Sequence, residues 1–95
     1  MSDALIELRN IGPKTVEWLE RAGINSAQRL RELGAIQAYM ALVDAGHGDN
    51  LNALWALEGA IQGIDFVDIA RNERDRLLAE LAAIREWHDI SDAPI

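Results

Sequence analysis

The side chains capable of acid–base or metal chemistry are few and scattered. There are two histidines, His47 and His88, and no cysteine, so thiolate metal sites and disulfides are excluded. A carboxylate buried in the apolar run around Glu58 could act as a general acid. We expect Glu58 instead to cap a helix or to pair with Arg29 or Arg31. Without a nucleophile–base pair or metal-ligand spacing, the sequence predicts no enzymatic activity, no metal site, no cofactor and no small-molecule substrate.

The segment with a definable binding mechanism is a tight turn over residues 8–13 (LRNIGP). Two helices joined by so short a turn must reverse sharply, which requires residues that tolerate a positive φ. Gly12 meets this requirement freely, and Asn10 is the best non-glycine alternative. Ile11 between them is expected to point inward and fix the turn to the core. Pro13 suits the first position of the next helix, where its missing N–H has no consequence.

A helix that begins at Pro13 creates an anion site. The amides around Gly12, Lys14 and Thr15 have no intrahelical partners, and they point outward at the positive end of the helix dipole. Lys14 adds a full positive charge beside them, and the hydroxyl of Thr15 adds another donor. The predicted ligand is therefore a phosphate group or an acidic partner.

The elements that must position this turn are helices. Alanine, leucine and isoleucine dominate the apolar residues, no segment alternates as a strand does, and glycines divide the chain into helix-length pieces. The predicted helices cover residues 3–8 (capped by Ser2 or Asp3), 13–22, 27–33 (capped by Ser26), 35–45, 50–62 and 73–87. We interpret Gly59 as a close helix–helix contact. The prediction is an all-α, compact bundle of five to six short helices, with one domain over residues 1–88 and a flexible tail over 89–95.

The charge distribution limits what the domain can bind. Residues 1–34 hold five basic and five acidic groups, whereas residues 35–95 carry the whole net charge of −7. Nucleic-acid binders usually present a basic face, so contact with a nucleic acid must be local and weak. No run approaches the ~20 apolar residues of a membrane span, and the start resembles no signal peptide. With no cysteine, the sequence favours a cytoplasmic location and no membrane partner.

The turn resembles the helix-hairpin-helix motif, whose usual form is Leu-Pro-Gly-Ile-Gly. Leu8, Ile11 and Gly12 match that form, while Arg9 replaces the proline and Asn10 the first glycine. In that family the hairpin amides hold a nucleic-acid backbone phosphate without reading bases, and Arg9 would add a phosphate contact. The resemblance therefore implies a nucleic-acid-binding hairpin. Its predicted residues are Arg9, Asn10, Gly12, Lys14 and Thr15.

A wider succession of residues is similar to the C-terminal domain of the TfoX/Sxy family. It consists of IGPKT at 11–15, AGI at 22–24, LRELGA at 30–35, AY at 38–39 and LNALWALEGA at 51–60. The family comprises bacterial regulators associated with natural competence, which implies a role in transcription regulation. Members often carry an N-terminal α/β domain before this one, whereas this sequence begins almost at the motif.

Two classes of function stay open on the sequence. In the first, the hairpin weakly contacts a DNA backbone without sequence preference. In the second, the domain binds a regulatory protein or a second copy of itself and never touches nucleic acid, with Trp18 and Trp87 as partner-binding residues. Trp55 lies in an apolar helix and is expected in the core, and His47, between two glycines, is expected to be exposed. A third possibility is that the hairpin is only a scaffold.

Overall fold

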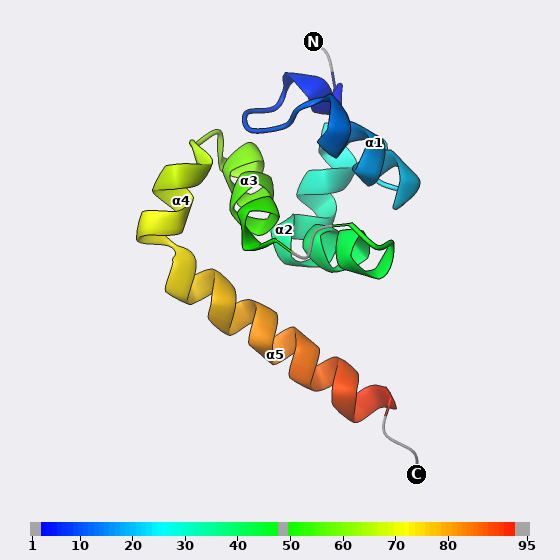
Figure 1. The fold of residues 1–95 in the computed structure, drawn as a ribbon, viewed down its shortest axis with the longest axis vertical. Coiled ribbons are helices and arrows are strands. Elements are labelled where there is room, and N and C mark those ends of the chain that lie inside the picture. Colours follow the sequence, from blue (N-terminus) through cyan, green and yellow to red (C-terminus); the bar gives the residue numbers. More distant parts are fainter. Residues whose placement is uncertain (1–2, 48–49, 93–95) are drawn as a thin grey trace.

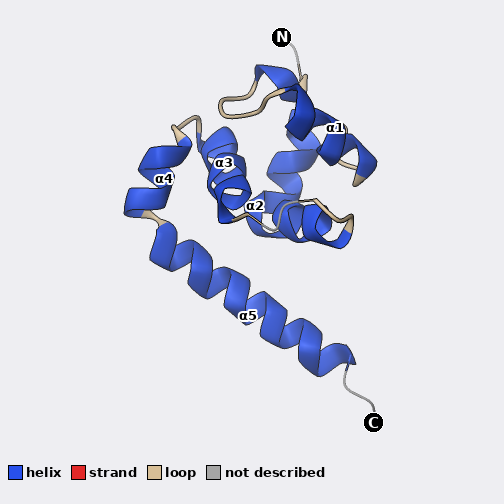
Figure 2. Cartoon of the chain, viewed as in Figure 1, coloured by secondary structure: helices blue, strands red, loops and turns tan. Residues whose placement is uncertain are grey.

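The computed structural model describes residues 3–47 and 50–92, with side chains as far as Arg85. Within these residues the chain is helical and contains no strand, which confirms the predicted all-α class (Figure 2). The elements are η1 (Leu5–Glu7), α1 (Pro13–Arg21), α2 (Ala27–Asp44), α3 (Leu51–Gln62), α4 (Phe66–Asn72) and α5 (Arg74–Asp92). No helix in this part is long and apolar enough to cross a membrane.

The segment before the turn is a single 3-10 turn, η1, rather than the predicted helix over residues 3–8. The capping prediction was wrong here, because Ala4 holds the N-cap position without a side-chain bond. Asp3 instead binds the head of α2. Its carboxylate accepts a hydrogen bond from the amide of Gln28 at 3.0 Å, and its carbonyl accepts one from the amide of Ala27 at 3.0 Å. These bonds tie the start of the chain to α2.

Local capping explains most of the other helix boundaries. Beyond the end of α1, Gly23 has a φ of +87°, and the amide of Ile24 bonds to the carbonyl of Leu19 at 2.8 Å, which is a Schellman ending. The Ser26 hydroxyl accepts a hydrogen bond from the amide of Arg29 at 3.1 Å, as predicted for the start of α2. Gly34, at φ +82°, kinks α2 between the two helices predicted on either side of it.

The core gathers around α3, which packs against both α2 and α4 (Figure 1). Leu54, Trp55 and Leu57 of α3 are buried there, so the predictions of a central buried helix and a core Trp55 are confirmed. The short α4 was not predicted. It begins because the carboxylate of Asp65 accepts a hydrogen bond from the amide of Val67 at 2.9 Å, and it buries Ile69 completely.

The last helix, α5, leads away from this core toward the C-terminus (Figure 1). It begins one residue later than predicted and runs to Asp92, past the predicted end at Trp87. Residues 89–92, assigned to the predicted tail, therefore continue the helix, while 93–95 lie outside the described residues. Among the side chains described, α5 buries Leu77 and Leu81. The hairpin is therefore supported by α2 and α3, and α5 lies far from it.

Candidate nucleic-acid interface at the hairpin

The turn between η1 and α1 reverses at Asn10, not at Gly12. Asn10 has a φ of +70°, the left-handed conformation that asparagine tolerates better than most residues. Gly12 has φ −100° and ψ 176°, an extended conformation open to any residue, so the prediction that it needs a positive φ was wrong. Ile11 between them is 6% exposed and points into the core, as predicted.

The head of α1 presents unpaired donors. Pro13 occupies the first helical position. The first helical hydrogen bond is the one that the amide of Val16 donates to the carbonyl of Gly12, at 3.0 Å. In the described part of the chain, the amides of Gly12, Lys14 and Thr15 have no hydrogen-bond partner. They lie at the positive end of the α1 dipole, where an anion is stabilised.

The Lys14 side chain, at the second position of α1, is exposed. It forms no ion pair with any described residue. Thr15 is half-buried, and its hydroxyl likewise has no described partner. The structure thus places Gly12, Lys14 and Thr15 next to one another at the head of α1, each with a donor that has no partner among the described residues.

The other two residues of the predicted site are engaged within the domain. The side-chain amide of Asn10 donates to the carbonyl of Ile64 at 2.9 Å, and its side-chain oxygen accepts from the amide of Phe66 at 3.2 Å. Arg9 forms an ion pair of 3.5 Å with Asp65 and keeps 56% of its side chain exposed. The tip of the hairpin is therefore fastened to the loop between α3 and α4, and the polar atoms of Asn10 are already paired.

This fastening explains the glycine in the middle of α3. A Cβ atom at Gly59 would overlap with the carbonyl oxygen of Ile64 and with the side-chain amide of Asn10. Gly59 also accepts a hydrogen bond from the amide of Ile64 at 2.8 Å. The prediction of a close helix–helix contact was wrong, because what approaches Gly59 is a turn residue and a loop carbonyl. We call Asn10, Gly59 and Ile64 the hairpin clasp.

The tryptophans predicted to bind partners have different surroundings. The ring of Trp18 is half-buried and stacks on His47, with the ring centres 5.3 Å apart and the planes 10° from parallel. His47 is itself half-buried, so the expectation of an exposed histidine was wrong. Part of the Trp18 ring is therefore covered by the domain. The side chain of Trp87 lies outside the described residues.

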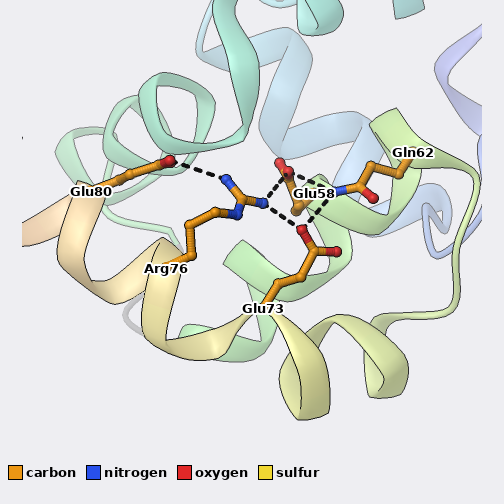
Figure 3. Close-up of polar contacts among 5 residues, drawn as sticks. All are labelled: Glu58, Gln62, Glu73, Arg76 and Glu80. Carbon is orange, nitrogen blue, oxygen red and sulfur yellow. Dashed lines mark hydrogen bonds and ion pairs between the residues drawn. The ribbon is translucent and has the colours of Figure 1, made fainter.

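Glu58 belongs to a network of ion pairs and hydrogen bonds that links α3 to the start of α5 (Figure 3). Its carboxylate pairs with Arg76 at 2.9 Å, so the prediction of Arg29 or Arg31 as its partner was wrong. Arg76 also forms ion pairs with Glu73 at 2.6 Å and with Glu80 at 3.1 Å. One guanidinium thus holds three carboxylates.

Gln62 completes this network and, with Arg76, acts on the pKa of Glu73. It donates to Glu58 at 2.8 Å and to Glu73 at 3.1 Å. The hydrogen bond from Gln62, followed by that from Arg76, lowers the pKa of Glu73 below its ordinary value, because both donors favour the ionised carboxylate. The hydrogen bonds that Arg76 donates to Glu73 and then to Glu58 raise the pKa of its guanidinium, because both acceptors favour the charged form. Every carboxylate in this network is held as an ion-pair partner, which is a structural arrangement.

Comparison with known proteins identifies the family. The profile of the TfoX C-terminal domain matches residues 1–81 of the chain. The chain belongs to the TfoX C-terminal domain family. It is similar to the DNA transformation protein TfoX of Haemophilus influenzae (strain ATCC 51907 / DSM 11121 / KW20 / Rd), with 34% identity over 77 residues. That match covers 81% of this chain and 36% of the relative, so the chain spans about a third of the relative's length.

A solved structure shares the fold of this TfoX-type domain. It is an uncharacterized protein from Listeria monocytogenes, with a TM-score of 0.74 and 28% sequence identity. The similarity covers 85% of this chain and 92% of the Listeria chain. The helical arrangement described above is therefore shared with a second protein over most of both chains.

The structure differs most from the predictions made from the sequence at the hairpin clasp and at the charge network around Arg76. Nothing local in the sequence points from Asn10 to the carbonyl of Ile64, 54 residues later. Gly59 was the available signal, since a glycine inside an apolar helix indicates a close approach. For Glu58 the available signal was Arg76, which lies in residues 71–76 (RNERDR), where basic and acidic residues alternate.

Proposed function

We propose that this TfoX C-terminal domain is a non-enzymatic regulatory module that holds a nucleic-acid backbone phosphate at the head of α1. The observation that carries the proposal is that the amides of Gly12, Lys14 and Thr15 have no hydrogen-bond partner in the described part of the chain, together with the exposed, unpaired side chain of Lys14. These groups are the donors that a phosphate oxygen requires, and they make no contact with the bases, so no sequence would be read.

Arg9 and Asn10 have different parts in this proposal. Arg9 is more than half exposed, and its ion pair with Asp65 at 3.5 Å is a surface pair of small energy, so its guanidinium can turn to a second phosphate. Asn10 is a positioning residue, because both polar atoms of its side chain already bond to the backbone of Ile64 and Phe66 and fasten the turn. One or two phosphate contacts on a chain of net charge −7 give weak, salt-sensitive binding, with a Kd on the order of 10⁻⁴–10⁻⁶ M.

A DNA titration with a charge-matched control tests the contact. Lys14→Glu and Arg85→Glu change the net charge equally, and both wild-type side chains are exposed and unpaired among the described residues. Arg85 lies on α5, the helix that leads away from the core and from α1 (Figure 1). We expect Lys14→Glu to abolish binding at low salt and Arg85→Glu to weaken it slightly. Equal losses in both variants would mean that net charge alone matters, and no binding by the wild type would end the proposal.

We also propose that the module acts in DNA transformation through transcription regulation. The support is its similarity to the Haemophilus protein, which is named for DNA transformation. The test is a chimera in which residues 1–81 replace the matching part of the Haemophilus protein, followed by a measurement of transformation frequency. A functional chimera that loses activity with Lys14→Glu would support the proposal, whereas a functional chimera indifferent to that change would separate the process from the hairpin.

A second candidate function is protein binding, and a specific observation favours it. Three large apolar residues at the α3–α4 junction are exposed: Ile64 by 36%, Phe66 by 39% and Val67 by 42%. The hairpin clasp joins this junction to the turn before α1, because Asn10 bonds to the backbone on both sides of Asp65. Adjacent exposed apolar residues of this size typify a surface that another chain covers.

A further inference from the structure

The carboxylate of Asp65 makes two separate contacts, one with each oxygen. Oδ1 accepts a hydrogen bond from the amide of Val67 at 2.9 Å and caps α4. Oδ2 pairs with a guanidinium nitrogen of Arg9 at 3.5 Å. Capping requires only an oxygen that accepts a hydrogen bond, and asparagine or serine supplies one as well as aspartate does. The negative charge of Asp65 is therefore not needed for the cap, and the group that this charge holds is Arg9.

The hairpin clasp fixes the backbone on both sides of this ion pair. Asn10, the residue after Arg9, donates to the carbonyl of Ile64 at 2.9 Å and accepts from the amide of Phe66 at 3.2 Å. These two bonds hold the residues before and after Asp65, so the turn before α1 lies beside the loop between α3 and α4 (Figure 1). The two charged side chains consequently stay near each other when their ion pair opens, and the pair can close again without movement of the backbone.

The ion pair uses little of what the Arg9 guanidinium can donate. It is a single contact at 3.5 Å, and the side chain forms no other bond with any described residue. A guanidinium matches a carboxylate or a phosphate best through two parallel hydrogen bonds. Because 56% of the Arg9 side chain is exposed, its remaining nitrogens are accessible from solvent. A phosphate can therefore take the place of the carboxylate at a small cost in free energy.

The pair also lowers the positive charge that the hairpin offers to an anion. Among the predicted site residues, Arg9 and Lys14 are the two cations. While Arg9 is held by Asp65, Lys14 is the one that has no ion pair with a described residue. When Arg9 leaves, the freed carboxylate places a negative charge close to the arriving phosphate. Asp65 therefore opposes anion binding both before and after the exchange.

We propose that Asp65 competes with a nucleic-acid phosphate for Arg9 and thereby weakens nucleic-acid binding at the hairpin. The inference rests on the proposed phosphate contact at the head of α1, and it names the residue that limits the affinity of that site. Binding is then an exchange, in which Arg9 leaves Asp65 for a backbone phosphate while Asp65 keeps its bond to Val67. Since exposed ion pairs contribute little free energy, the competition should raise the Kd for DNA roughly two- to fivefold.

A titration of the full-length chain with a short DNA duplex at low salt tests the competition through Asp65→Asn. The asparagine oxygen keeps the cap of α4, whereas its amide nitrogen cannot accept a hydrogen bond from Arg9. We expect the Kd to fall roughly two- to fivefold. Asp65→Ser, which keeps a capping oxygen without the charge, should give the same result and serves if the asparagine variant fails to fold. Circular dichroism checks the helix content of each variant.

The matched control is Asp68→Asn. Asp68 also lies on α4, is exposed and forms no ion pair with a described residue, so the change removes the same charge without releasing Arg9. It should lower the Kd by a smaller factor, through net charge alone. The second comparison repeats Asp65→Asn in an Arg9→Gln background. Without the guanidinium, the gain from Asp65→Asn should shrink to that of Asp68→Asn, which is the coupling that a double-mutant cycle measures.

Two outcomes would overturn this proposal. One is an equal gain in affinity from Asp65→Asn and Asp68→Asn, and the other is a gain from Asp65→Asn that persists in full with Arg9→Gln. If Lys14→Glu abolishes binding in the same series, the phosphate contact at the head of α1 stands in either case. If neither the wild type nor Asp65→Asn binds DNA, both proposals fail together.

Discussion

Replacing Gly59 by Ala should destabilise the domain, although alanine is the better helix former. Three effects compete. The alanine gains about 1 kcal/mol of helix propensity over glycine. Its Cβ meets the carbonyl of Ile64, which is backbone and yields little, at an overpacking cost of about 1–3 kcal/mol. It also displaces the Asn10 amide, whose two hydrogen bonds contribute about 0.5–1.5 kcal/mol each. The net loss in the free energy of unfolding is about 1–5 kcal/mol.

The assay is urea unfolding followed by tryptophan fluorescence and circular dichroism, with Gly12→Ala as the matched control. A Cβ atom at Gly12 meets nothing within 4 Å, and the backbone there is extended, so this change should stay within about 0.5 kcal/mol of the wild type. The double variant Gly59→Ala with Asn10→Gly should recover part of the loss, because one of the two obstructions is removed. A neutral or stabilising Gly59→Ala would refute the hairpin clasp as the structure draws it.

Three further predictions concern the network and the aromatic stack. Arg76→Met leaves three carboxylates facing one another and should lower the free energy of unfolding by about 1 kcal/mol, a modest figure because the guanidinium is 45% exposed; chemical denaturation measures it. Because the pKa of Glu73 is lowered in the folded state, its contribution is present above its ordinary value of 4.5 and disappears as the pH falls through the folded value. The urea midpoint should therefore drop on acidification below that value, and less steeply in Glu73→Gln; identical slopes would contradict this. His47→Ala should uncover the Trp18 ring and shift its fluorescence emission to the red, whereas an unchanged spectrum would mean that the stack does not persist in solution.

The helices were predictable because their signals are local. Caps and glycines act within a few residues, so the start of α2 at Ser26, its kink at Gly34 and the ending of α1 at Gly23 all follow from neighbouring residues. The helix α4 was missed for the same reason. With seven residues and one buried apolar side chain, Ile69, it is too short to show a helical period.

The candidate site was predictable only in part, because its surroundings come from distant segments. The role of Pro13 at the head of α1 follows from residue type alone. The hydrogen bonds of the Arg9 and Asn10 side chains do not follow from residue type, because their partners lie 54 to 56 residues away, on the loop between α3 and α4 and at the first residue of α4. The partner of Glu58 was likewise set by the meeting of α3 with α5, which no local pattern reveals.

The most direct measurement of the central claim is a two-dimensional amide NMR titration of the isotope-labelled full-length chain with a short DNA duplex at low salt. The account predicts the largest shifts at the amides of Gly12, Lys14 and Thr15, with the amide of Phe66, already bonded to Asn10, moving little. Shifts confined to other surfaces, or none at the head of α1 while DNA binds, would contradict it.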